Sequence, residues 1–206
     1  MKSPLMRLLI LLAVAAAMTA PATVSAEPAD SINLGFGGVP ALMKHCKADV
    51  YIVEYEHMLT SKLSVLGRGS EVVYKFDDGE YVEEGKPRGG EIGGRYYPGG
   101  GMKGFFIGGS VGYWRTDWTF RHNKDLPTEV RGESVTDSIR ANLDIGGRFP
   151  INSSNISIMP ELNIGRFFPS TTCSYTSPPS QVGAPCSQET EVKAYVFLAV
   201  MAGIGF

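Results

Sequence analysis

The stretch Glu191–Phe206, EVKAYVFLAVMAGIGF, decides the fold because its side chains divide into two alternating faces up to the last residue. One face is entirely apolar and consists of Ala194, Val196, Leu198, Val200, Ala202, Ile204 and Phe206. A period of two is typical of a β-strand. On the edge of a soluble sheet such a face would favour aggregation, whereas a strand that contacts lipid requires it. The stretch therefore predicts a strand that crosses a membrane.

Seven upstream segments show the same alternation, with one apolar face and one face that is polar or small. They are 31–39, 48–58, 63–76, 88–98, 103–116, 138–149 and 156–165. With the last segment they predict eight strands. The parity slips near Gly67 and Gly69, which we interpret as a β-bulge. Pro160 removes a ladder hydrogen bond, so we expect a bulge or a break there.

The connections between these segments alternate in length. Short connections are expected at 59–62, 98–102 and 150–155, and long ones at 39–47, 77–87, 117–134 and 169–190. Outer-membrane barrels have short periplasmic turns and longer extracellular loops, and an even number of strands returns the chain to the periplasmic side. No internal segment has the roughly 20 apolar residues of a membrane-spanning helix. The sequence predicts an all-β fold, an eight-stranded antiparallel up-and-down transmembrane barrel, rather than an exported soluble sandwich.

The first residues have the layout of a secretory signal peptide. Basic residues precede an apolar run at Leu8–Ala17, and the small residues Val24 and Ala26 follow it. We predict that residues 1–26 are removed and that 27–206 form the barrel, although a small-residue stretch just upstream also fits cleavage. Removal takes two of the 19 basic and none of the 21 acidic residues, which leaves a net charge of about −4. This charge gives no indication of nucleic-acid binding.

Polar side chains on the inward faces predict a network inside the barrel. An eight-stranded barrel encloses an interior that side chains can fill. The predicted network consists of Glu54, Glu91, Arg95, Arg140, Asn142, Asp144, Arg148, Glu161 and Asn163. Both signs are present, and buried charges need partners because an unpaired one costs several kcal/mol. We interpret the set as a polar plug, and a narrow or gated conduit is the alternative.

Aromatic residues gather near the expected strand ends, where they predict two interfacial girdles. One girdle would consist of Tyr55, Tyr96, Tyr97 and Phe149, and the other of Tyr74, Phe76, Tyr113, Trp114, Phe167 and Phe168.

The three cysteines would all remain after export to an oxidising compartment. Cys173 and Cys186 lie in one polar stretch, so a local disulfide between them is predicted. Cys46 is then left without a partner and is expected to be a free, exposed loop thiol. It lies too far from the cleavage site to be a lipid anchor.

Catalytic and metal-binding patterns are weak. His45 next to Cys46 has no further ligand at metal-binding spacing, and Asp77-Asp78-Gly79 starts like a calcium loop without the later oxygen ligands. His122, Glu129, Glu133 and Ser134 share one predicted loop, but a shared loop gives no base within reach of a nucleophile. Pro98–Gly101 is a tight turn without a following helix. We expect no cofactor, no metal and no enzymatic activity.

Residues 31–206 resemble the small eight-stranded outer-membrane barrels of the OmpX type and the OmpA membrane domain. The most specific element is Tyr195–Phe206, which is similar to the assembly signal that these proteins present to the barrel-insertion machinery, with Phe206 as its last residue. The resemblance implies an integral protein of the Gram-negative outer membrane. It also implies a monomer in contact with outer-membrane lipid, lipopolysaccharide and the assembly machinery.

Loops differ widely among such barrels, so the resemblance indicates the fold but does not indicate an activity. The expected function is a non-enzymatic structural or surface-interaction role with four extracellular loops. The alternatives are a narrow channel for small or apolar solutes and, in a third class, an enzyme that modifies lipid A.

Overall fold

The structure, a computed structural model, describes residues 28–38, 45–151, 154–178 and 193–206. The signal-peptide prediction therefore lies outside the described residues. The strands form one closed antiparallel sheet, in which β1 pairs with both β2 and β9. They are β1 (Asp30–Gly38), β2 (Cys46–Met58), β3 (Leu63–Asp77), β4 (Tyr81–Gly85), β5 (Arg88–Tyr96), β6 (Gly104–His122), β7 (Val130–Pro150), β8 (Ile156–Ser177) and β9 (Lys193–Gly205).

Two of these strands, β4 and β5, occupy a single position in the barrel. Both pair with β3 on one side and β6 on the other, and the register runs unchanged from Gly85 opposite Tyr74 to Arg88 opposite Glu71. Pro87 lies in the interruption, where it has no N–H to donate to the ladder. The closed ring thus has eight strand positions, which confirms the predicted fold class.

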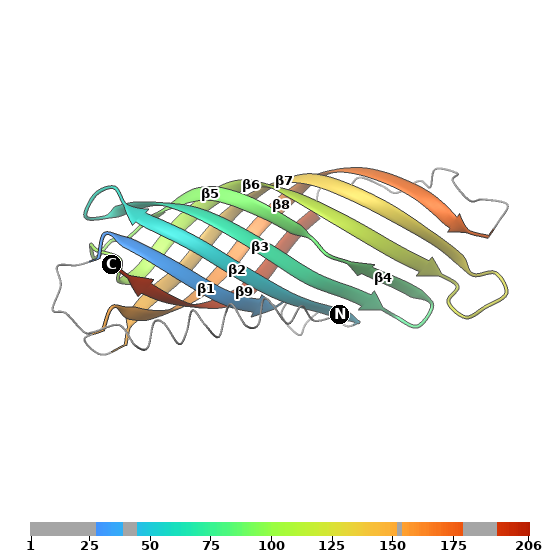
Figure 1. Cartoon of the computed structure of the whole chain (residues 1–206), viewed down its shortest axis with the longest axis horizontal. Coiled ribbons are helices and arrows are strands. Elements are labelled where there is room, and N and C mark those ends of the chain that lie inside the picture. The colour runs from blue at the N-terminus through green and yellow to red at the C-terminus, as the bar shows by residue number, and fades with distance from the viewer. Residues whose placement is uncertain (1–27, 39–44, 152–153, 179–192) are drawn as a thin grey trace.

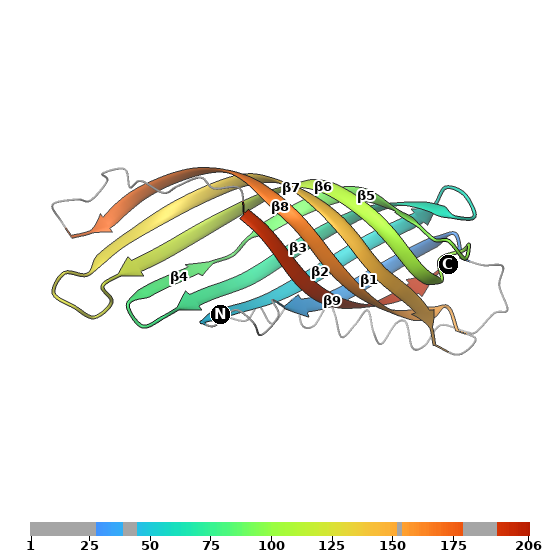
Figure 2. The ribbon, with the colours of Figure 1, turned by 180° about the vertical axis from the view of Figure 1, so that it is seen from behind.

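The strands are tilted and the two ends of the barrel differ (Figure 1). At one end, here called the turn end, lie the connections 59–62, 97–103 and 151–155 together with Phe206. At the other, the extended end, β6, β7 and β8 continue well past the start of β9 (Figure 2). The last described pair of β8 with β9 is Phe167 with Lys193, although β8 runs on to Ser177. None of the described residues forms a helix long and apolar enough to cross a membrane.

The predicted long loops at the extended end are wrong in three places. Residues 81–85 of the expected loop 77–87 form β4, most of 117–134 belongs to β6 and β7, and β8 takes 169–177 from the expected loop 169–190. The connection between β3 and β4 has only three residues, fewer than any turn-end connection. The strict alternation of short and long connections therefore does not hold. Many of the residues predicted to form long loops at this end extend the strands instead.

The bulge predicted near Gly67 and Gly69 is also wrong. The pairing of β3 with β2 runs without a shift from Ser64 opposite Met58 to Phe76 opposite Cys46. At Pro160 the structure has a break and no bulge, because the paired residues of β7 and β8 stop at Glu161 and resume at Ile158 in the same register.

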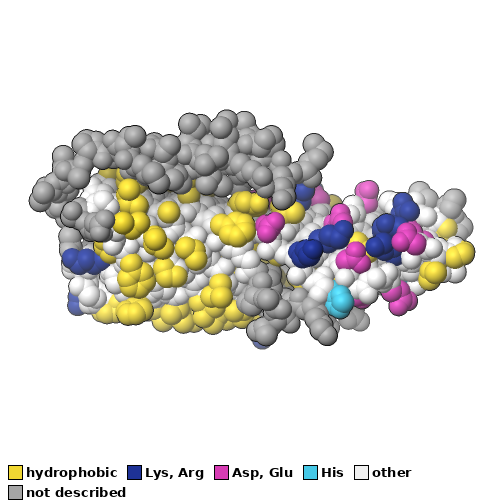
Figure 3. All heavy atoms as spheres, turned by 90° about the horizontal axis from the view of Figure 1, so that it is seen from below, with side chains coloured by type: hydrophobic (Ala, Val, Ile, Leu, Met, Phe, Trp, Pro, Cys, Tyr) yellow, Lys and Arg dark blue, Asp and Glu magenta, His cyan; other side chains and the backbone are white. Residues whose placement is uncertain are grey.

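The alternating faces lie as predicted in the half of the barrel near the turn end. Outward side chains there are apolar and strongly exposed, among them Phe105 (75%), Ile92 (71%) and Val200 (56%). Hydrophobic side chains predominate on one part of the visible surface, and most of the charged ones lie on the other (Figure 3). We call the first part the apolar belt. A barrel in lipid needs such a belt, and its closed sheet leaves no edge unpaired in hydrocarbon.

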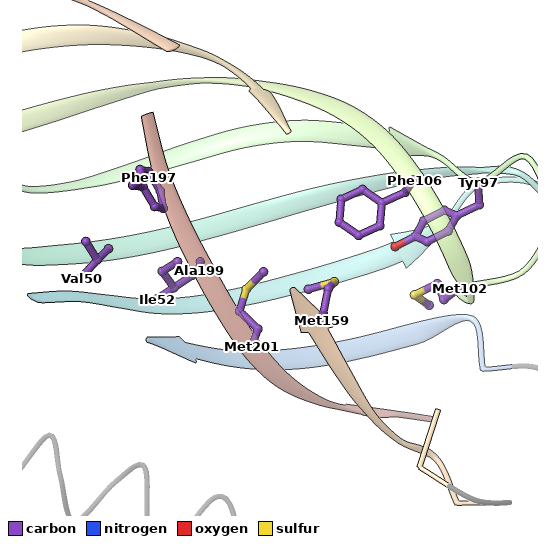
Figure 4. Packing of buried hydrophobic residues seen from close by; sticks show 9 residues of the cluster. All are labelled: Val50, Ile52, Tyr97, Met102, Phe106, Met159, Phe197, Ala199 and Met201. Atoms are coloured by element: carbon purple, nitrogen blue, oxygen red, sulfur yellow. The ribbon is translucent and has the colours of Figure 1, made fainter. Parts of the chain in front are cut away.

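The interior of the barrel has an apolar side as well as a polar one. Buried apolar residues from β2, β6, β8, β9 and the connection after β5 pack together (Figure 4), and they are Val50, Ile52, Tyr97, Met102, Phe106, Met159, Phe197, Ala199 and Met201. Tyr97 and Trp114 were expected in the aromatic girdles, but both are buried inside, at 0% and 1% exposure. Tyr74, Phe76 and Phe167 were also expected there and are also wrong, because they have the inward parity of their strands. The exposed members Tyr55, Tyr96 and Phe149 remain compatible with a girdle.

Candidate functional site

The centre of the barrel interior holds two arginines shared by three carboxylates. Arg95 donates from Nη1 to Glu54 Oε1 at 2.6 Å and to Glu56 Oε2 at 2.8 Å, and from Nη2 to Glu161. Arg68 donates from Nη2 to Glu54 Oε2 and to Glu161 Oε1, both at 2.7 Å. All five side chains are buried, so these charge-assisted bonds act in a medium that screens them weakly.

Further donors complete the coordination of Glu56. Arg148 Nη2 donates to Glu56 Oε2 at 2.8 Å, and Ser64 and Tyr97 donate their hydroxyls to Oε1 at 2.5 and 2.9 Å. Partners from β3, from β5 and the connection after it, and from β7 thereby meet on one carboxylate of β2. We call Glu54, Glu56, Arg68, Arg95, Arg148 and Glu161 the ion network.

Asp144 lies at the side of this network. Its side chain is fully buried and its Oδ1 is 3.8 Å from Arg68 Nη1, which donates instead to Asn163 Oδ1 at 3.0 Å. Neither Asp144 oxygen has a hydrogen-bond partner among the described residues. Buried polar atoms of this kind are commonly satisfied by internal water, which needs two or more polar partners.

A second cluster closes the barrel nearer the extended end. Arg140 Nε lies 3.1 Å from Glu91 Oε1, and it contacts Asn142 Oδ1 at 2.8 Å and the Tyr195 hydroxyl. Its guanidinium carbon lies 4.3–5.6 Å from the centres of four aromatic rings, those of Trp114, Phe167, Tyr195 and Phe197. Cation–π contacts of this geometry are favourable when desolvated. We call this the arginine box.

The nine residues predicted for the polar network all have inward side chains, and the structure distributes them between these clusters. Eight are buried and Asn142 is partly buried, where it donates to Glu91 Oε2 at 2.8 Å. Sequence reasoning missed Arg68, because the supposed parity slip at Gly67 moved it off the inward face. Glu56 was also left out, although it has the same parity as Glu54. A strict alternation of inward and outward side chains along β2 and β3 would have predicted both Arg68 and Glu56.

The cysteines lie in different surroundings. Cys46 is free, as expected, but it is the partly buried first residue of β2 and no exposed loop thiol. Cys173 is buried in β8 opposite Ser134. Its predicted partner Cys186 lies outside the described residues, so this disulfide stays a prediction.

The candidate catalytic cluster is not assembled. Glu133 and Ser134 are consecutive strand residues that point to opposite sides of β7, and Ser134 is buried. Glu129 is engaged by Arg121 and Arg131. Within the described ranges no group of three or more His, Cys, Asp or Glu residues has a geometry that could hold a metal ion.

Asp77 and Asp78 form a turn. Asp77 accepts from the backbone N–H of Gly79 at 3.1 Å, and Asp78 accepts from that of Tyr81 at 2.7 Å. The N–H of Tyr81 is the main reason why the pKa of Asp78 lies below its usual value. These bonds are the local chemistry by which aspartates initiate turns.

Comparison with solved structures shows the same class of fold. The chain is similar to the translocator domain of the autotransporter NalP from Neisseria meningitidis, with a TM-score of 0.53, 8% identity and coverage of 98% of this chain and 95% of that one. It is also similar to a major outer membrane protein from Thermus thermophilus, with a TM-score of 0.52, 13% identity and coverage of 85% and 100%. No protein-family model and no curated protein matches the sequence.

The closed sheet, the apolar belt and the charged interior define a membrane-spanning β-barrel of the outer-membrane type. The protein is an integral protein of the Gram-negative outer membrane.

Proposed function

We propose that this barrel is a non-enzymatic surface-interaction protein of the OmpX-like kind, with the extended end outside the cell. The observation that carries the proposal is the length of β6, β7 and β8, which have 19, 21 and 22 residues. A strand needs only about 9–11 residues to cross a bilayer. About 10 residues of each strand therefore project beyond the apolar belt, a distance of about 30 Å along the strand.

The projecting sheet carries features of a contact surface. Its inward face is aromatic, with ring pairs Tyr74–Trp118 at 5.2 Å and Phe120–Tyr175 at 6.3 Å. From Phe168 onward β8 pairs with β7, while its described pairing with β9 has ended. An edge of this kind offers backbone groups to which an extended partner segment can add.

The channel alternative is weaker because buried side chains of the ion network and the arginine box lie in the interior at two levels. Planar-bilayer conductance of the purified protein separates the two functions. We expect no ion-conducting steps from the wild type. Steady conductance would support the channel.

The test of surface interaction uses a photo-crosslinking amino acid at an outward position of the projecting sheet, Thr172, in intact cells. The matched control carries it at Leu59 in the turn-end connection. We expect one recurrent adduct at Thr172 that disappears when the Thr119–Glu133 hairpin tip is replaced by a short turn. Equal labelling at both sites, or no adduct, contradicts the proposal.

A separate measurement tests the absence of enzymatic activity. We expect the mass of lipid A to be the same in cells with and without the protein, because the proposed function includes no modification of lipid A.

A further inference from the structure

The outer surface of β2, β3, β5 and β6 contains a groove within the apolar belt. Its volume is about 780 Å³, and its outward lining consists of Tyr55, Val65, Gly67, Ile92, Gly109 and Val111. The glycines make it hollow, since a Cβ added at Gly67 or at the neighbouring Gly69 would meet nothing within 4 Å. Lipid chains surround this surface, so specific binding of one lipid would require a polar group next to the groove.

Two arginines lie beyond this groove, on the side of the extended end. Arg88 follows Ile92 toward that end on β5, and Arg115 follows Val111 on β6, each four residues along its strand, or about 13 Å. Between them and the groove lie only Gly90 and Tyr113 on the outward face. They are the first charged outward residues of these two strands, so they mark the rim of the belt.

The two arginines are direct cross-strand partners, and the carboxylate of Asp117 is an ion-pair partner of both. Arg88 is opposite Arg115 in the register, and like charges directly opposite each other destabilise a sheet. Asp117 lies 3.6 Å from Arg88 Nη2 and 3.7 Å from Arg115 Nε, both longer than a charge-assisted hydrogen bond. The side chains of Arg88 and Arg115 are 64% and 50% exposed. Their donors are therefore accessible to an anion from the membrane.

Neighbouring groups limit which anion fits. Glu71 is opposite Arg88, and Asp137, which accepts a hydrogen bond from the Tyr113 hydroxyl, is opposite Arg115. A weak anion would gain little between these carboxylates. A phosphate monoester has a charge of about −1.5 to −2 and three acceptor oxygens, which match two guanidinium groups.

We propose that this surface binds one lipid with a phosphate monoester headgroup, the phosphate between Arg88 and Arg115 and one acyl chain in the groove. Lipid A and phosphatidic acid share this chemistry. We expect the site to bind lipids with a phosphate monoester in preference to phosphodiester lipids such as phosphatidylglycerol. The membrane supplies the lipid from the side, so no lumen is needed.

Native mass spectrometry of the full-length barrel, released from nanodiscs that contain phosphatidic acid, phosphatidylglycerol and diacylglycerol, tests the proposal. We expect one retained phosphatidic acid, preferred about tenfold or more over the other two lipids. Arg88→Gln with Arg115→Gln should lower this preference about tenfold, while Arg166→Gln, an exposed arginine on β8, should not change it. A second arm with lipid A and its dephosphorylated form should show the same dependence on the phosphate.

The groove is tested separately. Gly67→Leu fills it, and Ala202→Leu adds a similar apolar side chain on the outward face of β9 as the control. We expect Gly67→Leu, but not Ala202→Leu, to reduce retention of the lipid. If Gly67→Leu prevents folding, Ile92→Ala removes one wall of the groove and should weaken retention. Unchanged binding after the double arginine substitution, equal retention of phosphatidylglycerol, or unchanged retention in folded groove variants would overturn the proposal.

Discussion

On β7, the outward side chains between Phe149 and Ile139 are apolar or small, whereas Asp137, Glu133 and Arg131 follow on the same face toward the extended end. In the belt half, the outer face is apolar and a buried ionic interior lies behind it. In the extended half the outer face carries charged side chains, the inner face carries aromatic and small polar ones, and ladder bonds, ring pairs and exposed ion pairs hold the sheet. The comparison indicates that the same kind of charge pair contributes very differently to the free energy of unfolding in the two halves.

The largest difference is expected between arginines. Arg95→Met leaves Glu54, Glu56 and Glu161 without a shared buried cation, and breaking such pairs costs about 3–5 kcal/mol. Arg121→Met removes a partly exposed pair with Glu129 and should cost less than about 1 kcal/mol. The free energy of unfolding, from urea titrations in phospholipid vesicles, measures both. Similar losses in the two variants would mean that the interior is wet.

A charge on the outer face is the next comparison. Leu143→Arg places a cation in the belt and should cost about 2–4 kcal/mol near mid-membrane. Val135→Arg makes the same change further along β7, opposite Asp117, where we expect an effect within about 0.5 kcal/mol. The same titrations apply. A large cost at Val135 would place the lipid boundary further along β7 than the charged residues indicate.

The belt could be predicted from the sequence because lipid imposes a period of two on every strand that crosses it. Leu198, Leu143 and Ile107 are exposed as the alternation indicates, and the nine predicted polar residues lie inside. One failure here was local. Gly67 and Gly69 have no side chain and break the apolar pattern without changing the register, so they were mistaken for a bulge and Arg68 was lost with it.

The extended half could not be predicted because its outer face is polar, so the strands lack the apolar outward face by which the belt strands were recognised. In residues 117–122 the outward Asp117, Thr119 and Arg121 alternate with the inward Trp118, Phe120 and His122, but aromatic side chains inside and polar ones outside resemble a loop in composition. The ladder that makes this segment a strand depends on partners far along the chain. Which groups meet in the ion network is likewise set by barrel closure, as with Arg95 and Glu161.

Glycines give a smaller test of the two halves. A Cβ at Gly132 would clash with the Phe120 ring and would lie 2.9 Å from the Ser174 carbonyl oxygen, so Gly132→Ala should cost about 1–3 kcal/mol through overpacking. At Gly67 a Cβ meets open space, and Gly67→Ala should be neutral or should stabilise by up to about 1 kcal/mol. Amide exchange of β7 and β8 should detect the first change. Equal protection in both variants would contradict the tight packing at Phe120.

The smallest expected effect is a pH dependence confined to the connection 123–129, which lies outside the belt. Glu129 accepts from Arg121 Nε and Nη2 at 3.0 and 2.9 Å, from the backbone N–H of Asp125 at 2.9 Å, and from Arg131. These donors, with Arg121 contributing most, hold the pKa of Glu129 at about 2, below the 4.5 of a free glutamate.

Because the pKa of Glu129 is lower in the folded turn, its stabilising contribution is complete above about pH 4.5 and is lost as the pH falls toward about 2. We therefore expect amide protection factors at Lys124 and Leu126 to fall between pH 5 and pH 2.5, while those of Leu143 in the belt stay constant. Glu129→Gln keeps the shape but cannot titrate, so it should show low protection in this turn at both pH values. A turn that loses protection to the same extent in this variant would contradict the assignment of the effect to Glu129.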